Sequence, residues 1–386
     1  MSKKNISVGQ DGIVIPPTKE DENYNAMLNA KGTNELAKIP TSSRAITAQF
    51  TYHPEVNEGE LFTSEDVKVT VKEFDNSSSL GKSILFFYNI LCKYTKDISV
   101  KTNVSEIENK ESREVYLDLD DFISSFGVPD RKKAVQRLKE YYETLKNITL
   151  DFEEFNPKDQ TVKKYSLEIF SGKGTEQSLI KRSKNYFFIL NYDLVKYLVE
   201  RNYITYFPNR AFGIDVMRYP NALSVTNKLS VMYSENYWKS NKGLISLEKL
   251  LESVSDIPSF ETVRQTNRHY YDRIIEPLEK TMDYLKDMKI LQDWEWCNKK
   301  RSPLTDEQIQ GYGYAALKEC YIKYEMADYP DDIMKLRKEK IDVKKEKKVK
   351  KGANLMRKKT QPNAQKDIMN QVSVSNYSKA PWGLSV

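Results

Sequence analysis

Residues 115–146 read VYLDLDDFISSFGVPDRKKAVQRLKEYYETLK and decide the fold of the region around them. Val115–Asp118 has the composition of a short strand, and Leu119–Phe126 has the apolar spacing of a short helix. Gly127–Pro129 predicts a turn, and Pro129 is well placed to open the next helix because a first helical residue needs no N–H partner. We therefore expect a strand, a short helix, a turn and a longer helix in succession.

The longer helix, Asp130–Lys146, has two different faces. Apolar residues recur at three- and four-residue steps and predict a buried stripe; they are Ala134, Leu138, Tyr141 or Tyr142, and Leu145. Long polar and basic side chains occupy the other face: Arg131, Lys132, Lys133, Gln136, Arg137 and Lys139. A helix that lies in the major groove of DNA needs one apolar face that packs against the protein and an opposite face of long side chains that donate hydrogen bonds.

Two alternating segments follow this helix and predict a β-hairpin. Ile148–Phe152 and Tyr165–Phe170 flank the turn sequence NPKDQ at 156–160. Helix, turn, basic-faced helix and hairpin in this order indicate a winged helix-turn-helix. The flanking sequence predicts four further elements: a strand at Val67–Val71, a buried helix at Lys82–Lys93, a strand at Tyr186–Leu190 and a helix at Asp193–Glu200.

The same order recurs after residue 220. We expect a helix over Ala222–Tyr237, a short helix over Leu247–Val254 capped by Ser246, and a turn at Asp256–Pro258. A long helix then opens at Ser259, and a strand covers Ile290–Trp296. Pro277 lies inside the long helix and predicts a kink or break near Glu276, because proline lacks the donor and crowds the preceding turn.

The long helix carries its own group of possible base-reading side chains. They lie largely off the apolar stripe of that helix: Arg264, Gln265, Asn267 and Arg268. Arginine pairs with guanine, and glutamine or asparagine with adenine, whereas lysine mostly holds phosphate. Two such helix faces, each within a predicted helix-turn-helix followed by a wing, favour double-stranded DNA as the ligand.

The predicted fold class is α+β, with tandem winged helix-turn-helix domains. Residues 1–45 are polar and predict a disordered N-terminal segment. Residues 46–207 and 208–330 would form the first and second winged-helix domains, and residues 331–386 a basic, disordered tail. The 25 Tyr and 15 Phe residues fall mostly on stripe positions, which favours core packing over base stacking.

The formal net charge of +6 is unevenly distributed. Between Lys335 and Thr360 there are 13 Lys and Arg against 3 acidic residues, a net of +10, so the other 360 residues carry −4. A run of this kind is typical of a solvated arm or an interaction tail, and nucleic acid is its natural partner. DNA affinity in the rest of the chain must therefore come from local helix faces.

Several classes of protein are excluded. No apolar run approaches the length of a membrane span, and the largely polar residues 1–12 lead us to expect no export signal. Cys92, Cys297 and Cys320 form no C-x-x-C motif and are expected to be reduced, buried thiols. Gly81-Lys82-Ser83 lacks the first glycine of a phosphate loop, since position 76 is Asn76. We expect no enzymatic activity, no metal and no cofactor, in a cytoplasmic protein.

Residues 221–297 contain a set of structural motifs: KLS at 228–230, ISLEKLL at 245–251, IP at 257–258, RIIEPLE at 273–279 and ILQDWEW at 290–296. This pattern resembles the second domain of the replication initiator proteins of plasmids and related mobile elements, a family with two winged-helix domains. Over about 60–200 only the order of elements and the DRKKAVQRL helix match. The first 45 and last 55 residues are not covered.

The resemblance implies a bacterial origin-binding protein, associated with the nucleoid or a plasmid, without catalysis of its own. It would bind repeated origin sequences in double-stranded DNA, promote origin opening and recruit the host replication initiator or helicase. Arg264, Gln265, Asn267 and Arg268 would read the repeat. The basic face of the first domain would contact DNA or support a homodimer.

Two other functions use the same sequence features. A winged-helix transcriptional repressor of a plasmid or phage would have the same fold. An interaction protein could bind other proteins through its winged domains and use the basic tail as a nonspecific anchor. Footprinting, replication of an origin plasmid in trans, and the salt dependence of binding separate the three.

Overall fold

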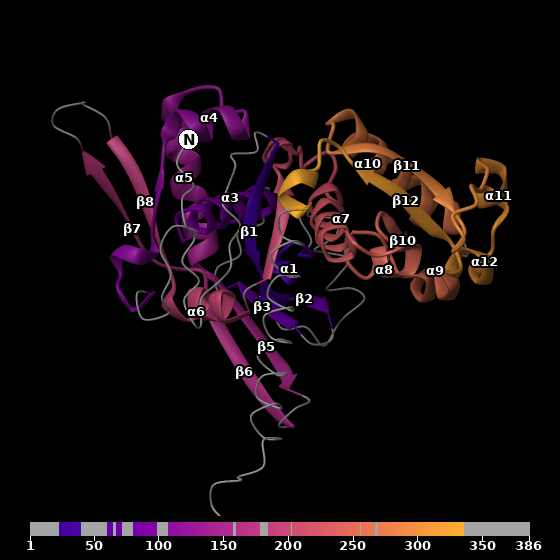
Figure 1. Ribbon diagram of the computed structural model, residues 1–386, viewed down its shortest axis with the longest axis horizontal. Coiled ribbons are helices and arrows are strands. Elements are labelled where there is room, and N and C mark those ends of the chain that lie inside the picture. The colour runs from indigo at the N-terminus through magenta and orange to yellow at the C-terminus, as the bar shows by residue number, and fades with distance from the viewer. Residues whose placement is uncertain are drawn as a thin grey trace, which may run out of the picture. The chain divides into compact units, whose positions relative to one another are not determined.

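Two lobes with the same strand order lie within residues 1–330, which form one compact unit of the computed structural model (Figure 1). The structure describes residues 23–39, 60–64, 67–71, 80–98, 107–156, 160–177, 184–201, 203–254, 256–266 and 269–335. Asp331–Lys335 belong to a second unit and are helical.

The first lobe comprises α3 (Leu80–Ile98), β4 (Glu114–Leu117), α4 (Leu119–Phe126), α5 (Arg131–Lys146), β7 (Phe170–Gln177) and β8 (Lys184–Leu190). A 3-10 turn, Glu111–Arg113, precedes β4. The three strands form an antiparallel sheet in the order β4-β8-β7. The strand, the two helices and the buried helix expected from sequence are confirmed, although α3 extends beyond the predicted Lys82–Lys93 at both ends.

Local capping explains why α4 and α5 begin and end where they do. The Asp118 carboxylate accepts hydrogen bonds from the backbone N–H groups of Asp120 and Asp121, which starts α4. Gly127 ends α4 in the left-handed conformation, with φ of 59°. Asp130 starts α5 by accepting from the N–H of Lys133. Pro129 therefore precedes the cap instead of opening the helix.

The predicted hairpin forms, but it is not the hairpin of the first lobe's sheet. β5 (Ile148–Asn156) and β6 (Thr161–Glu168) pair from Thr149↔Glu168 to Asn156↔Thr161. They continue a separate sheet with β2 (Glu60–Ser64) and β3 (Val67–Val71), in the order β2-β3-β5-β6. The chain then begins β7 at Phe170, and β7 and β8 form the hairpin that adjoins β4. Alternation identifies a strand but does not specify its partner, so the prediction of the wing at 148–170 was wrong.

The N-terminal segment was expected to be disordered over residues 1–45, and residues 23–39 contradict this. β1 (Tyr24–Asn29) pairs antiparallel with β9 (Tyr203–Pro208) from Tyr24↔Pro208 to Asn29↔Tyr203. Met27 and Leu28 are fully buried, so this short polar-looking segment contributes apolar area to the core. Residues 1–22 and 40–45 lie outside the described residues.

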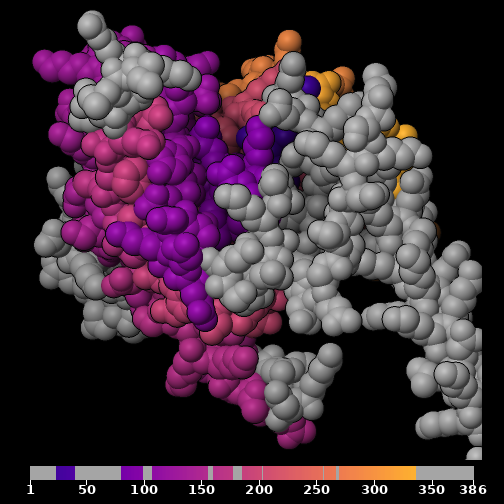
Figure 2. Space-filling model, turned by 60° about the vertical axis from the view of Figure 1, so that its left-hand side comes forward, coloured from indigo at the N-terminus to yellow at the C-terminus, as the bar shows by residue number. Residues whose placement is uncertain are grey.

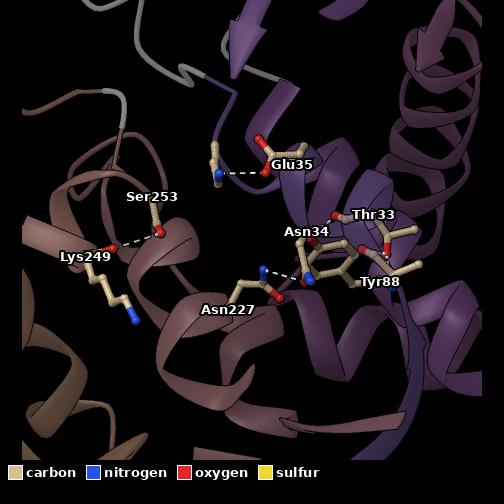
Figure 3. A network of polar contacts seen from close by, with 9 residues as sticks. Thr33, Asn34, Glu35, Tyr88, Asn227, Lys249 and Ser253 are labelled. Atoms are coloured by element: carbon tan, nitrogen blue, oxygen red, sulfur yellow. Dashed lines mark hydrogen bonds and ion pairs between the residues drawn. The ribbon is translucent and has the colours of Figure 1, made fainter. Parts of the chain in front are cut away.

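Helix α1 (Lys31–Leu36) connects α3 to the second lobe (Figure 3). The Tyr88 hydroxyl of α3 donates a hydrogen bond of 2.7 Å to the carbonyl of Thr33. On the other side, the Asn227 amide donates to the Asn34 side-chain oxygen at 3.2 Å. These contacts tie the N-terminal segment to both lobes.

The second lobe contains α7 (Ala222–Asn236), β10 (Leu244–Ser246), α8 (Leu247–Leu251), α9 (Phe260–Thr266), α10 (Glu276–Asp287), β11 (Leu291–Cys297) and β12 (Tyr321–Met326). Its sheet has the order β10-β12-β11, in which the first strand pairs with the last, as in the first lobe. The short helices α11 (Asp306–Gly311) and α12 (Tyr314–Lys318) are inserted between β11 and β12. α6 (Tyr192–Arg201) and the 3-10 helix Asn209–Gly213 lie between the two lobes in sequence.

The prediction of one long helix from Ser259 was wrong: α9 ends at Thr266, His269 is not helical, and a second helical segment runs from residue 270 to residue 287. Tyr271–Ile275 adopt a π-helix, and the N–H of Glu276 donates to the carbonyl of Tyr271. Pro277 lies in the first turn of α10, where its missing N–H costs least. The helix is therefore distorted near Glu276, as predicted for a kink, but residues 270–287 stay helical and there is no break at that point. The predicted cap at Ser246 is also confirmed, since its hydroxyl accepts from the N–H of Lys249.

Aromatic side chains form much of the first lobe's core, as expected. Phe86 of α3 lies 5.1 Å from Phe188 of β8 and 5.9 Å from Phe122 of α4, measured between ring centroids. Edge-to-face contacts of this kind add to the burial of apolar area. No helix among the described residues is long and apolar enough to cross a membrane.

Candidate nucleic-acid interface

The stripe predicted for α5 anchors this helix to the first lobe. Its five members are buried: Ala134, Leu138, Tyr141, Tyr142 and Leu145. Tyr142 packs against Phe170 and Phe188 of the sheet, with centroids 5.5 and 6.0 Å apart. The opposite face of α5 is therefore available to solvent along most of its length.

Arg131 is the first residue on the exposed face of α5, and its guanidinium is paired with a carboxylate of α4. Its Nη2 and Nε atoms donate to the two carboxylate oxygens of Asp120 in α4, at 2.5 and 3.1 Å. The hydrogen bond to Asp120 raises the pKa of Arg131. Arg131 thus links the two helices of the helix-turn-helix, and its guanidinium must exchange Asp120 for a phosphate or base if it contacts DNA.

Lys132 and Lys133 are exposed, and their ammonium groups have no partner among the described residues. Gln136 is also exposed, and its amide donates to Glu140 one turn later, at 2.8 Å. The two lysines are the predicted α5 residues best placed to neutralise phosphates.

Arg137 differs from the other predicted α5 residues because it is half-buried. It hydrogen-bonds the Tyr141 side chain and opposes the rise in the pKa of Tyr141 that burial causes. It also contributes to the lowered pKa of Lys82, which burial mainly causes. The structure therefore places Arg137 beside α3, where it contacts the protein.

In the second lobe, α9 presents Arg264 and Gln265 to solvent. The helix begins at Phe260, after Ser259, whose hydroxyl accepts from the N–H of Thr262 at 3.2 Å. Val263 and Phe260 are buried and hold the helix against the lobe. Asn267 and Arg268, predicted at the same face, lie outside the described residues.

Tyr314 of α12 contacts the side chains around α9, and no feature of the sequence predicted this role. Its hydroxyl donates to Glu261 at 2.6 Å, which lowers the pKa of Glu261. The Arg264 guanidinium lies over the Tyr314 ring, 4.9 Å from its centroid. Lys318 bridges Glu248 of α8 and Glu261 of α9, at 3.1 and 3.3 Å. The inserted α12 therefore contacts both α8 and α9 and orients Arg264 by a cation–π contact.

Within the described residues, metal-binding side chains do not cluster on either face. Among the described residues, no group of three or more His, Cys, Asp and Glu side chains could hold a metal ion. The three cysteines are buried and unpaired, and burial raises the pKa of the Cys320 thiol to about 11. The arrangement is suited to contacting an extended polyanion through exposed cations and amides.

The exposed faces of α5 and α9 form a candidate interface for double-stranded DNA. Comparisons with known proteins gave few matches. No family model matches the sequence, and no curated protein matches it. The chain is similar to the crystal structure of selenomethionine derivatives of domains 2 and 3 of RctB, with a TM-score of 0.36 and 10% identity over 76% of this chain and 98% of that chain. A second structure of RctB domains 2–3 gives a TM-score of 0.32 and 9% identity, over 68% and 87% of the two chains.

Proposed function

We propose that this protein is a replication initiator that binds repeated origin sequences in double-stranded DNA through two winged-helix lobes, without enzymatic activity of its own. The observation that carries the proposal is the repeated topology. In each lobe a helix and a short strand are followed by two helices, α4 and α5 or α8 and α9, and the short strand pairs with the last strand of the lobe. Further elements stand before the last two strands: β5 and β6 in the first lobe, and α10 with the π-helix before it in the second. A helix-turn-helix with a flanking hairpin is a DNA-binding arrangement.

In this proposal α5 and α9 are the recognition helices. Each is the second helix of its pair and presents long donors to solvent. Lys132 and Lys133 of α5 would hold phosphates, while Arg264 and Gln265 of α9 would reach base edges. Asn267 and Arg268 follow α9 directly in sequence and would extend the same contact.

The choice of an initiator rests on the sequence motifs at 228–296, which resemble those of plasmid and mobile-element initiators. By the same resemblance, its partners would be the host replication initiator or helicase, and it would act in the bacterial cytoplasm on a plasmid or the nucleoid. The division of the chain into a first winged-helix domain at 46–207 and a second at 208–330 is part of this proposal.

Footprinting on the DNA that flanks the gene tests the DNA-binding part. Protection of spaced direct repeats is expected, and uniform weak binding to all sequences would contradict it. Replication of an origin plasmid with the protein supplied in trans tests the initiator part. Protection of an operator with no support of replication would identify a transcriptional repressor instead.

A further inference from the structure

The outer face of the first lobe's sheet has an aromatic strip that the proposed DNA contacts do not use. Tyr116 of β4 is 46% exposed, and only three other large apolar residues among those described are classed as exposed. Its register partner is Phe187 of β8, and the two ring centroids are 5.5 Å apart. Two aromatic rings therefore lie side by side on a solvent-facing sheet.

Gly174 of β7 keeps this strip flat and open. It is the register partner of Phe187 on the other side, and a Cβ atom at Gly174 would lie 2.2 Å from the Phe187 ring. The Phe187 ring thus covers the glycine backbone. Any side chain at position 174 would displace the ring, so the strip depends on glycine at this register position.

This strip faces away from the recognition helix. Val115 and Phe188, the neighbours of Tyr116 and Phe187 in the strands, are buried on the opposite face, where Phe188 packs against Phe86 of α3 and Tyr142 of α5. A ligand on the strip would leave α5 accessible. In Figure 2, this side of the first lobe comes forward, and parts of the chain coloured as β7 and β8 lie at the surface.

Carboxylates surround the strip. The Tyr116 hydroxyl donates to Glu114 at 3.1 Å. The pKa of Tyr116 is raised by desolvation, by this hydrogen bond, and by the charges of Glu114, Glu176 and Glu111. Two basic side chains described beside or within these strands are engaged elsewhere: Arg113, which precedes β4, donates to the Leu190 carbonyl, and Lys173 of β7 pairs with Glu143 of α5 on the opposite face. Phosphates would be repelled here, whereas a cationic group would be attracted.

We infer that the Tyr116–Phe187 strip is a docking site for an arginine- or lysine-bearing segment of a partner protein. The cationic side chain would lie on the aromatic rings, and Glu111, Glu114 and Glu176 would pair with its charge or with its neighbours. The carboxylates around the two rings favour this occupant over nucleic acid.

The test uses a fluorescein-labelled peptide of alternating arginine and serine, with binding to the full chain followed by fluorescence anisotropy. Y116A should weaken binding by about two- to fivefold, because an exposed cation–π contact is lost. Y116F should bind as the natural protein does, since it keeps the ring. E114Q/E176Q should also weaken binding and reduce its salt dependence. V162A, which alters another exposed apolar strand residue, is the matched control.

Equal peptide binding by Y116A, V162A and the natural protein would overturn the inference. So would a Y116A-dependent loss of single-stranded oligonucleotide binding, which would indicate base stacking, or a Y116A-dependent loss of self-association without peptide binding. Circular dichroism checks the fold of Y116A, and E114Q/E176Q supplies a second route if that variant misfolds. Binding of the same variants to origin DNA should not change, which separates this inference from the proposed function.

Discussion

Arg264, which we propose to contact DNA, is an exposed side chain whose orientation is limited by its neighbours. Its guanidinium lies over Tyr314, and the Tyr314 hydroxyl in turn is held by Glu261 of the same helix as Arg264. A stacked arginine keeps its N–H donors in the plane of the group and free to pair at its edge. The contact therefore limits the orientations of Arg264 while leaving it able to bind.

Arg264→Ala should weaken binding to the cognate DNA site by about 1–3 kcal/mol, because a base contact is lost. Binding is measured on cognate and random duplexes by fluorescence anisotropy. Arg218→Ala is a matched control, since Arg218 is an exposed arginine over the ring of Tyr219, at 5.5 Å, outside both recognition helices. An equal loss on random DNA would assign Arg264 to a phosphate contact.

Lys132→Ala and Lys133→Ala should weaken cognate and random DNA binding alike, because lysine mainly holds phosphate. Each should also reduce the slope of log K against log salt by about 1. Titrations at several salt concentrations measure the slope. Lys280→Ala serves as the control, since Lys280 of α10 is exposed and pairs with Glu276. An unchanged slope in both α5 variants would exclude α5 from the DNA contact.

At the scale of elements, α4 and α5 could be predicted almost to the residue because their limits depend on neighbours in sequence. Asp118, Gly127 and Asp130 carry the stop and start signals within three residues of the atoms they satisfy. The partner of the β5–β6 hairpin could not be predicted, because β2 and β3 lie about 80 residues earlier and alternation does not encode pairing.

The same distinction applies to the candidate site: the exposure of its residues could be predicted from sequence, but their side-chain contacts could not. The exposure of Lys132, Lys133, Arg264 and Gln265 follows from helical periodicity. The contacts of Arg131, Arg137 and Tyr314 involve residues of other helices or depend on packing, which sequence spacing alone does not reveal. The inserted α12 is the clearest case, because a five-residue helix between two strands has too little periodicity to be recognised.

Gly127→Ala should destabilise the fold by about 1 kcal/mol, because alanine is disfavoured at a φ of 59°. No atom lies within 4 Å of the added Cβ, so the cost comes from the backbone alone. Gly311→Ala is the matched control: it too has no atom within 4 Å, but its φ is not in the left-handed region. Urea unfolding of the two variants measures the difference, and equal stabilities would contradict the prediction.

Glu261→Gln tests the connection between α9 and α12 through its pH dependence. The pKa of Glu261 is lowered in the fold, chiefly by the Tyr314 hydrogen bond, so its contribution is present above the unfolded value of 4.5 and is lost as the pH falls through the folded value. The variant should be slightly less stable than the natural protein at pH 7, by less than about 1 kcal/mol because the group is exposed. The difference should shrink at acid pH; a constant difference in urea unfolding would refute this.

At the scale of the whole molecule, the N-terminal strand joins parts of the chain that are distant in sequence. The N–H of Leu28 donates to Thr95 Oγ1 of α3 at 2.8 Å, while β1 pairs with β9 and α1 contacts α7. Residues 23–39 therefore belong to the folded body that supports both lobes, although their composition resembles that of a tail.

Thr95→Val should destabilise the protein by about 1–3 kcal/mol, because it leaves the buried N–H of Leu28 without an acceptor at nearly constant volume. Thr144→Val is the matched control: the Thr144 hydroxyl donates to the carbonyl four residues earlier, as Thr95 does, but Thr144 is only half-buried and accepts no hydrogen bond from β1 in the described structure. Thermal unfolding of both variants measures the effect. Equal changes would mean that the contact with β1 contributes nothing.

The burial of every thiol has a practical consequence for studying this protein in motion. Cys92, Cys297 and Cys320 are the chain's three cysteines, at most 3% exposed, and burial raises the pKa of each above its ordinary value. Because the thiolate is the reactive form, maleimide dyes should not react with any of the three thiols in the folded state. Cysteines introduced at Ser125 and Lys299, both exposed, would accept dyes selectively. Energy transfer between them could then follow the distance between α4 and the β11 end of the second lobe as DNA is added.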